Sequence, residues 1–215
     1  MSIYGRTSQY YLKKYNASTN APMTGGKISS SDLQMLLNSS YDDDIKDTQN
    51  YIVDKDLSNL TTRVYKRNNN KNDVFVVHRG SKDIQDVIDN YTYIKQTHYN
   101  NKRLDKARKI QQEAQEKYGS KNITTLGHSK GAYYAEQLGQ DSKDIITLNK
   151  PVHLSDVFKR VPMNQTDIKT TYDPVSVLRP YQKGNKPYII ESKTMNILKE
   201  HTTGVLDDME VIFGS

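Results

Sequence analysis

Hydrophobic and polar positions follow two different periodicities along this chain. Short apolar or β-branched runs predict strands, and longer runs with apolar positions three and four apart predict helices. The two kinds of run alternate, which predicts an α/β fold with a mainly parallel sheet flanked by helices. The expected strands cover 63–67, 74–77, 123–126, 144–149, 167–172 and 187–191. Helices are expected to begin at Ser31 and to cover 83–97, 101–118 and 132–138.

The first two expected strands are joined by the polar loop 68–73, so they form a hairpin element on the N-terminal side of the sheet. Residues 1–28 are polar and contain Gly25-Gly26 near their end, which predicts an arm or linker. Residues 29–215 then form a single domain, long enough for a full core. The arm suits docking on a protein partner, but wrapping around its own domain fits equally well.

Composition narrows the class of protein. Hydrophobic residues make up 34% of the chain and the mean hydropathy is −0.84, which is polar for an enzyme of this size. The chain has no cysteine, which excludes a disulfide framework and thiol chemistry. Its start does not resemble a signal peptide, and no apolar run approaches the roughly 20 residues of a membrane span. We therefore expect a cytoplasmic or virion-associated protein, and the excess of lysine over arginine suggests an AT-rich viral or protist genome.

The net charge of +6, with a pI of about 9.2, favours anionic partners. The lysines are scattered among acidic residues, and the densest stretch, 102–109, is typical of the solvated face of a helix. No nucleic-acid-binding motif is present, so nucleic acid is not an expected partner. Peripheral contact with an anionic membrane fits the charge.

The pentapeptide Gly127-His128-Ser129-Lys130-Gly131 carries the clearest chemical signal. It lies between an expected strand and an expected helix, where G-x-S-x-G forms a nucleophile elbow. The turn is so tight that Gly127 and Gly131 must lack side chains, and it holds the serine hydroxyl clear of the sheet. An ordinary Gly-Ser turn could have the same sequence, so the motif is interpreted together with its context.

A serine nucleophile needs a base, and the base needs a carboxylate that orients it. In α/β-hydrolases the chain order is Ser, then the acid, then His, and only His153 and His201 follow Ser129. For His153 the acid would lie within 136–144, on or beside the helix after the motif. For His201, Asp173 directly follows an expected strand, although it would also suit an ordinary turn. We therefore predict Ser129, Asp173 and His201 as the catalytic triad.

A second motif adds a family resemblance. The apolar run Val74–Val77 leads into His78-Arg79-Gly80-Ser81, and Asp86 and Asp89 follow on an expected helix. This order of features resembles the class 3 lipases, the fungal triacylglycerol lipase type of α/β-hydrolase. The resemblance implies an oxyanion hole formed by Ser81 and by the backbone N–H of Lys130. Further similar segments are 144–151 and 172–175, so the likeness covers roughly residues 60–205.

The chain also departs from the pattern of that family. Tryptophan is absent, so Asp86-Val87 stands where an Asp-Trp pair is usual. Lys130 places a cation at an elbow position that is commonly apolar. The segment 82–90, where these lipases carry a lid, has the pattern of an ordinary amphipathic helix. Interfacial activation on triglyceride droplets is therefore not expected.

The sequence thus predicts a serine hydrolase of lipid esters, a lipase or esterase, with phospholipid as a candidate substrate because of the basic charge. The reaction proceeds through an acyl-enzyme on Ser129 and requires no metal or cofactor. Two alternatives stay open. A catalytically silent hydrolase fold could serve as a structural or docking protein, for example in a virus particle. The same acyl-enzyme could also transfer its acyl group to an alcohol other than water.

Overall fold

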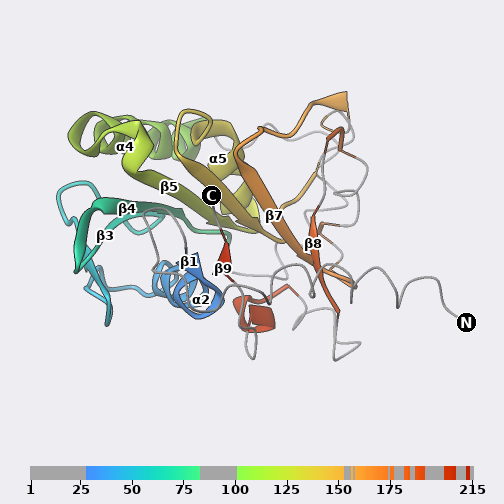
Figure 1. Cartoon of the computed structure of the whole chain (residues 1–215), viewed down its shortest axis with the longest axis horizontal. Helices are drawn as coiled ribbons and strands as arrows, with labels where there is room; N and C mark the ends of the chain where they lie inside the picture. Colours follow the sequence, from blue (N-terminus) through green and yellow to red (C-terminus); the bar gives the residue numbers. More distant parts are fainter. Residues whose placement is uncertain are drawn as a thin grey trace, which may run out of the picture.

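A seven-stranded sheet runs through the protein, with helices on both faces (Figure 1). The computed structural model describes residues 28–82, 101–152, 156, 158–173, 175–176, 182–184, 187–191, 201–206 and 212–213. The predicted arm up to residue 27, the predicted helix 83–97 with Asp86 and Asp89, and His153 lie outside the described residues. The sheet confirms the predicted α/β-hydrolase fold class.

The strands of this sheet lie in the order in which they occur along the chain. The first three, β2 to β4, pair antiparallel, and the pairs from β4 to β8 are all parallel. This gives the predicted hairpin next to a parallel sheet. The strands are β2 (Tyr51–Val53), β3 (Thr62–Arg67), β4 (Asn70–His78), β5 (Ile123–His128), β6 (Asp144–Leu148), β7 (Gln165–Thr170) and β8 (Tyr188–Ile190).

The hairpin differs from the sequence prediction in two respects. Strand β4 already begins at Asn70, because the chain turns tightly and pairs Arg67 with Asn70 across a bulge. The edge strand β2 was not predicted; it pairs Tyr51 with Arg67. Its outward-facing Ile52 is exposed, as is usual for a short strand at the edge of a sheet.

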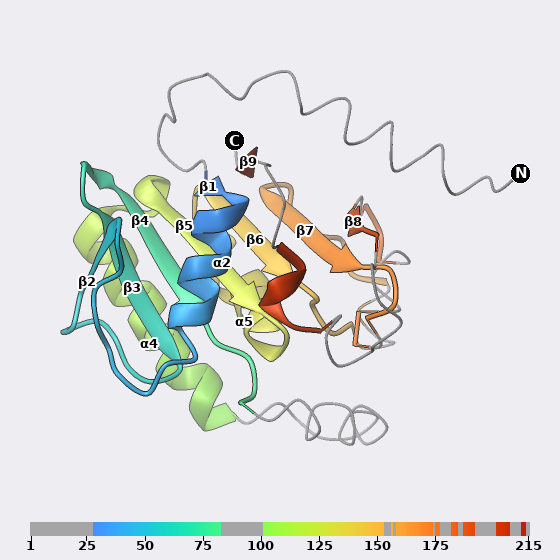
Figure 2. The same cartoon turned by 90° about the horizontal axis from the view of Figure 1, so that it is seen from below.

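Strand β4 shows why the central strands are continuously apolar. Phe75 and Val77 point to the face covered by α2 (Ser30–Ser39), and Val74 and Val76 point to the face covered by α4 (Asn101–Tyr118). Successive side chains of a strand point to opposite faces, so a strand buried on both faces needs apolar residues throughout. The two views show α2 on one side of the sheet, with α4 and α5 (Lys130–Leu138) on the other (Figures 1 and 2).

Helix α2 begins at Ser30, one residue before the predicted start at Ser31, and Ser29 is its N-cap. The hydroxyl of Ser29 accepts the Asp32 N–H at 3.1 Å, which satisfies one of the free donors of the first turn. The apolar side chains of this helix pack on the sheet together with η4 (Thr203–Leu206), a short segment from the end of the chain. A two-stranded sheet of β1 (Ile28–Ser29) and β9 (Ile212–Phe213) also joins the start and the end of the described chain. The single turn η1 (Ser120–Asn122) leads into β5.

Among the described residues, no helix combines the length and the apolar character that crossing a bilayer requires.

Candidate active site

The candidate site lies at the carboxyl ends of the parallel strands. Strand β4 ends at His78 and leads into Arg79-Gly80-Ser81, β5 leads into Ser129, and β7 is followed by Asp173 three residues later. Parallel strands point their carboxyl ends to the same edge of a sheet, where α/β proteins bind their ligands. The register brings His78 opposite Gly127, so the turn after β4 and the elbow after β5 are neighbours.

Ser129 stands between β5 and α5 in a backbone conformation that few residues adopt. Its φ is 55° and its ψ is −129°, and Asn149 is the other non-glycine residue of the described chain with positive φ. A conformation of this kind costs roughly 1–3 kcal/mol and persists where the surrounding structure enforces it. Here the Ser129 N–H donates to the carbonyl oxygen of Leu148, 3.0 Å away, at the end of the neighbouring strand. The nucleophile-elbow conformation is therefore built into the sheet.

The two glycines of the motif allow this turn to pack. A Cβ on Gly131 would lie 2.0 Å from the carbonyl oxygen of His78, and one on Gly127 would lie 2.4 Å from the carbonyl oxygen of Gly131. Both obstacles are backbone atoms, which cannot rotate away. Gly80 is equally confined, because its Cβ would lie 2.9 Å from the Cβ of Ser129. The elbow and the turn after β4 are thus in direct contact.

Asp173 and His201 form a buried pair. The Nδ1 of His201 lies 2.5 Å from Oδ1 of Asp173, and their side chains are 2% and 0% exposed. The second carboxylate oxygen, Oδ2, accepts the N–H of Ser176 at 2.7 Å. Each oxygen of the carboxylate therefore has a hydrogen-bond partner. Because the carboxylate occupies Nδ1 of the imidazole, Nε2 is the ring nitrogen that can exchange a proton with another group.

Several buried polar atoms at this edge have no hydrogen-bond partner among the described residues, and two of them belong to Ser129 and His201. Within the residues that the structure describes, Oγ of Ser129 and Nε2 of His201 make no hydrogen bond. A buried polar atom without a partner costs free energy, and a catalytic role is one of the reasons for which a protein retains such an atom. A hydroxyl and an imidazole nitrogen are also the pair that a serine nucleophile and its base require.

His128, the second residue of the pentapeptide, uses both ring nitrogens. Its Nδ1 lies 2.7 Å from the hydroxyl of Tyr41, and its Nε2 lies 2.7 Å from the carbonyl oxygen of His201. The hydroxyl of Tyr41 also accepts the N–H of Gly80 at 3.0 Å. The sequence analysis missed the role of both residues. The position of His128 next to Ser129 was the available signal, whereas Tyr41 lies in a turn without a motif.

Arg79 in the turn after β4 lies close to two further cations, Arg103 and Lys130. Arg103 on α4 donates to the carbonyl oxygens of Arg79 and Gly80, the latter at 3.0 Å. Burial lowers the pKa of Arg79, Arg103 and Lys130, and Arg103 contributes further to the lowering at Lys130. None of the three forms an ion pair within the described part of the chain. Coulombic interactions connect Arg103 with both Arg79 and Lys130, so the three residues concentrate positive charge beside this turn.

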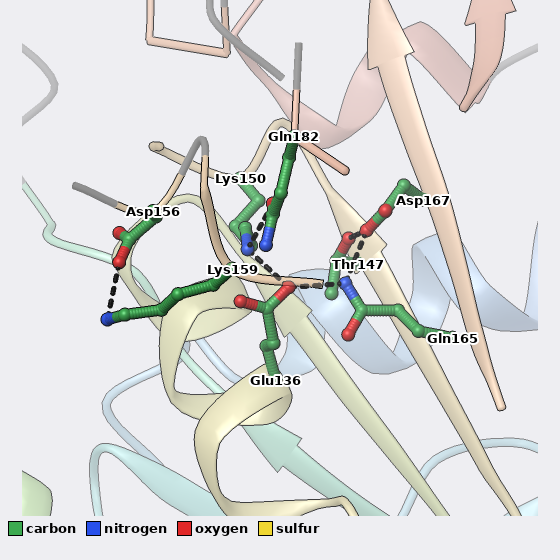
Figure 3. A network of polar contacts seen from close by, with 8 residues as sticks. All are labelled: Glu136, Thr147, Lys150, Asp156, Lys159, Gln165, Asp167 and Gln182. Atoms are coloured by element: carbon green, nitrogen blue, oxygen red, sulfur yellow. Dashed lines mark hydrogen bonds and ion pairs between the residues drawn. The ribbon is translucent and has the colours of Figure 1, made fainter. Parts of the chain in front are cut away.

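A network of polar side chains lies between α5, which follows the elbow, and the neighbouring segments of the sheet (Figure 3). Glu136 on α5 forms a buried ion pair with Lys150, which follows β6, and Lys150 also donates to Gln182 at 3.3 Å. Gln165 at the start of β7 bridges this pair to Asp167, with distances of 2.8 and 2.7 Å from its Nε2 to the two carboxylates. The network connects α5 to the segment after β6 and to β7. It stabilises the scaffold of the candidate site.

The described residues include no group of three or more His, Asp or Glu side chains that could hold a metal ion. The polar groups gathered at the sheet edge are instead a hydroxyl, an imidazole–carboxylate pair and cations.

Comparison with known families gives a direct match. The sequence profile of a phospholipase-like family, the Tle-like phospholipase domain, matches residues 11–137, more than half of the chain. The chain belongs to the Tle-like phospholipase domain family. The matched part of this Tle-like domain contains the turn after β4, the elbow and almost all of α5, whereas Asp173 and His201 lie beyond it. Membership confirms the predicted kinship with lipases and places the Tle-like domain among hydrolases of lipid esters in general.

Solved structures extend the comparison beyond the matched segment. The Tle-like chain is similar to the Lip2 lipase of Yarrowia lipolytica, with 15% identity, a TM-score of 0.52 and coverage of 80% of this chain and 83% of that chain. A lipase–propeptide complex from Rhizomucor miehei aligns at 14% identity and a TM-score of 0.46, covering 88% and 87% of the two chains. A triacylglycerol lipase from Penicillium expansum aligns at 14% identity and a TM-score of 0.42, covering 86% and 90%. At this identity the likeness to Lip2 shows a shared fold, and no curated protein sequence matches significantly.

Proposed function

We propose that this protein is a serine hydrolase of lipid esters in which Ser129, His201 and Asp173 form the catalytic triad. The observation that carries the proposal is the elbow conformation of Ser129 at the sheet edge where Asp173 and His201 are hydrogen-bonded. The positive φ of a serine between a strand and a helix is the geometry that exposes a nucleophile to substrate. The unpartnered Oγ of Ser129 and Nε2 of His201 supply the groups between which a proton has to move.

In this mechanism Oγ of Ser129 attacks the ester carbonyl carbon while Nε2 of His201 takes its proton. Asp173 keeps the His201 proton on Nδ1 and stabilises the imidazolium that forms. The N–H groups of Ser81 and Lys130 stabilise the oxyanion; Lys130 supplies the first N–H of α5, directly after Ser129. His201 then gives its proton to the leaving alcohol. A water molecule, activated by the same imidazole, releases the carboxylic acid from the acyl-enzyme.

Labelling with a fluorophosphonate probe tests the nucleophile. We expect the probe to label wild type on Ser129, and labelling to be lost in Ser129→Ala and strongly reduced in His201→Ala. Ser31→Ala is the matched control, because Ser31 is exposed in the first turn of α2, and its labelling should equal that of wild type. A folded wild-type protein that the probe does not label would contradict the proposal and favour a structural or docking role.

Phospholipid is the proposed substrate class, and two observations support it. The family to which the chain belongs is named for phospholipase activity. Arg79, Arg103 and Lys130 bring positive charge to the site, with no ion pair among the described residues, and burial of these cations strengthens their attraction to a phosphate group. A neutral triacylglycerol offers these cations no anionic group to bind.

Vesicle assays test this substrate class. We expect wild type to release fatty acid faster from phosphatidylglycerol vesicles than from triolein droplets. Lys130→Gln keeps the backbone N–H but lowers this ratio of rates severalfold, whereas the matched control Lys55→Gln, at an exposed position, leaves the ratio unchanged. Equal rates on both lipids would contradict the phospholipid assignment. Mass spectrometry of the products distinguishes free fatty acid from a new ester, and hence hydrolysis from acyl transfer.

A further inference from the structure

The side chain of His128 is placed where three loops of the candidate site meet. It belongs to the elbow, its Nδ1 contacts Tyr41, and its Nε2 contacts the backbone of His201, each at 2.7 Å. Tyr41 in turn accepts the N–H of Gly80 in the turn after β4, at 3.0 Å. Three contacts therefore connect the turn that precedes Ser81, the nucleophile and the segment that carries the base.

The direction of each hydrogen bond follows from the chemistry of the groups. A carbonyl oxygen only accepts, so Nε2 of His128 donates to His201. A neutral imidazole that donates from Nε2 has a lone pair on Nδ1, so this atom accepts the hydroxyl proton of Tyr41. The oxygen of Tyr41 then accepts from Gly80. These hydrogen bonds form a series that runs from Gly80 through Tyr41 and His128 to His201. Every donor in this series has an acceptor.

The series is built from neutral side chains. Burial and the proximity of His201 lower the pKa of His128 to about 3, whereas hydrogen bonding to His201 and the charge of Asp173 act in the opposite direction. Burial raises the pKa of Tyr41 to about 12, although Gly80, Arg103 and Arg79 favour its charged form. A charged His128 would lose its acceptor at Nδ1 and would repel the imidazolium that the proposed reaction forms on His201. The neutral ring avoids both effects.

Close packing keeps the series rigid. A Cβ on Gly80 would lie 2.4 Å from the hydroxyl oxygen of Tyr41 and 2.9 Å from the carbonyl oxygen of His128. The rings of Tyr41 and His128 meet edge to face, with centroids 5.8 Å apart, and those of His128 and His201 lie 5.1 Å apart. Because Gly80 already donates to Tyr41, an oxyanion donor in this turn has to come from a later residue, which agrees with the role proposed for Ser81.

We propose that Tyr41 and His128 are positioning residues that set the placement of the turn after β4 and of the His201 backbone relative to Ser129. This inference rests on the proposed hydrolase function, because it gives these loops the tasks of oxyanion binding and proton transfer. Neither side chain touches the reacting atoms in this mechanism. Each side chain instead holds a backbone segment that carries reacting groups. A displacement of such a segment by about 1 Å can change the reaction rate by two orders of magnitude.

Tyr41→Phe is the decisive variant, because it removes one oxygen and keeps the ring. We expect kcat for a soluble p-nitrophenyl ester to fall roughly 10–100-fold with KM within about twofold. The Gly80 amide should also exchange its hydrogen faster. Tyr65→Phe is the matched control: its buried hydroxyl lies 3.0 Å from Ser39 Oγ, and its kcat should stay within about twofold of wild type. His128→Gln, which keeps a donor and an acceptor, should retain more activity than His128→Ala.

Nuclear magnetic resonance of ¹⁵N-labelled histidine provides a readout that does not depend on catalysis. We expect His128 to show a protonated Nε2 and an unprotonated Nδ1 from pH 8 to pH 5. A ring that carries its proton on Nδ1, or titrates near pH 6.5, would overturn the inference, as would a wild-type kcat in Tyr41→Phe. Failure of the probe to label Ser129 overturns the proposed function alone, because the ring tautomer and the Gly80 amide exchange still decide whether the series exists.

Discussion

Asp173 and His201 share a buried hydrogen bond of 2.5 Å although 28 positions separate them along the chain. The orientation of the Asp173 carboxylate is set independently, because its Oδ2 accepts the N–H of Ser176 at 2.7 Å. An asparagine at position 173 would therefore keep its oxygen on Ser176 and turn its NH₂ group toward His201. That group donates, so the imidazole would have to present an unprotonated Nδ1 and carry its proton on Nε2.

Asp173→Asn is consequently expected to leave the fold intact and to disable the base. The wrong tautomer of His201 cannot accept the proton of Ser129, and a change of this kind lowers kcat by roughly 10⁴-fold in a serine protease triad. We expect a loss of that order in p-nitrophenyl ester hydrolysis, with an unchanged circular dichroism spectrum. Asp105→Asn, on the exposed face of α4, serves as the control and should behave as wild type. Retention of activity within tenfold in Asp173→Asn would exclude Asp173 as the acid of the triad.

Gly131→Ala tests the steric argument for the elbow. The added Cβ would lie 2.0 Å from a backbone oxygen, so β4 and α5 would have to separate. Overpacking typically costs about 1–3 kcal/mol of unfolding free energy, and a contact this short with a backbone atom places the loss at the upper end of that range or above it. Urea denaturation should show this loss, or the variant should fail to accumulate as folded protein.

Gly184→Ala is the matched control for that substitution. Gly184, unlike Gly131, has a positive φ of 77°, and the nearest atom to its Cβ would be a flexible Arg160 side-chain carbon 3.5 Å away. We expect a loss of about 1 kcal/mol from backbone strain alone. Equal losses in the two variants would show that the space around Gly131 is less confined than the structure indicates.

The sequence predicted the sheet well where its strands are buried on both faces. Strands β4, β5 and β6 need continuous apolar or β-branched runs, and such runs are visible without any knowledge of the fold. Strand β2 was missed because three residues, Tyr51–Val53, are too few to show a period. Its place in the sheet depends on pairing with β3 rather than on a pattern of its own.

The residues of the proposed triad could be named in advance because the motif and the chain order restrict the choices, and the structure brings Asp173 and His201 together. The contact between Tyr41 and His128 could not be predicted, because 87 positions separate them and neither local pattern implies it. The sequence analysis placed Arg103 in the stretch 102–109, which it interpreted as the solvated face of a helix. This interpretation is correct for the exposed residues next to Arg103. A 3.6-residue period, however, places it on the side of the buried Ala107 and Ile110, from which it reaches the turn after β4.

The buried ion pair between Lys150 and Glu136 yields a prediction about stability. Lys150→Met removes the cation and leaves the Glu136 carboxylate at a site where its side chain is only 7% exposed. Removal of one partner of a buried ion pair typically costs about 3–5 kcal/mol. We expect a loss of about that size in urea denaturation, and partial recovery in the double variant Lys150→Met/Glu136→Gln, which removes both charges.

The pair between Lys109 and Glu113 on α4 is the matched control for Lys150→Met. Its lysine and glutamate side chains are 76% and 40% exposed, so solvent screens their attraction. Lys109→Met should change the unfolding free energy by less than about 0.5 kcal/mol. A small loss in Lys150→Met as well would mean that water or another cation reaches Glu136.

Two buried histidines predict how stability depends on pH. Burial lowers the pKa of His78 to about 4 and that of His128 to about 3, whereas both groups titrate near 6.5 in an unfolded chain. Below pH 6.5 the unfolded chain therefore binds more protons than the folded protein, so the unfolding free energy falls as the pH falls. This contribution is fully present above pH 6.5 and is lost between that pH and the folded pKa values. Between pH 7 and pH 5 the two groups together lower the unfolding free energy by about 4 kcal/mol.

Urea denaturation at pH 7, 6 and 5 measures this effect as a shift of the midpoint with a constant m-value. His78→Gln separates the contribution of one ring, because His78 contacts Thr62 Oγ1 and Gln111 on the side of α4 and lies outside the Tyr41–His128 series. The variant should lose roughly half of the pH dependence over this range, whatever its stability at pH 7. Unfolding free energies that are equal at pH 7 and pH 5 in wild type would show that both rings are already protonated in the folded protein at pH 5, and the series through His128 would then lack its acceptor.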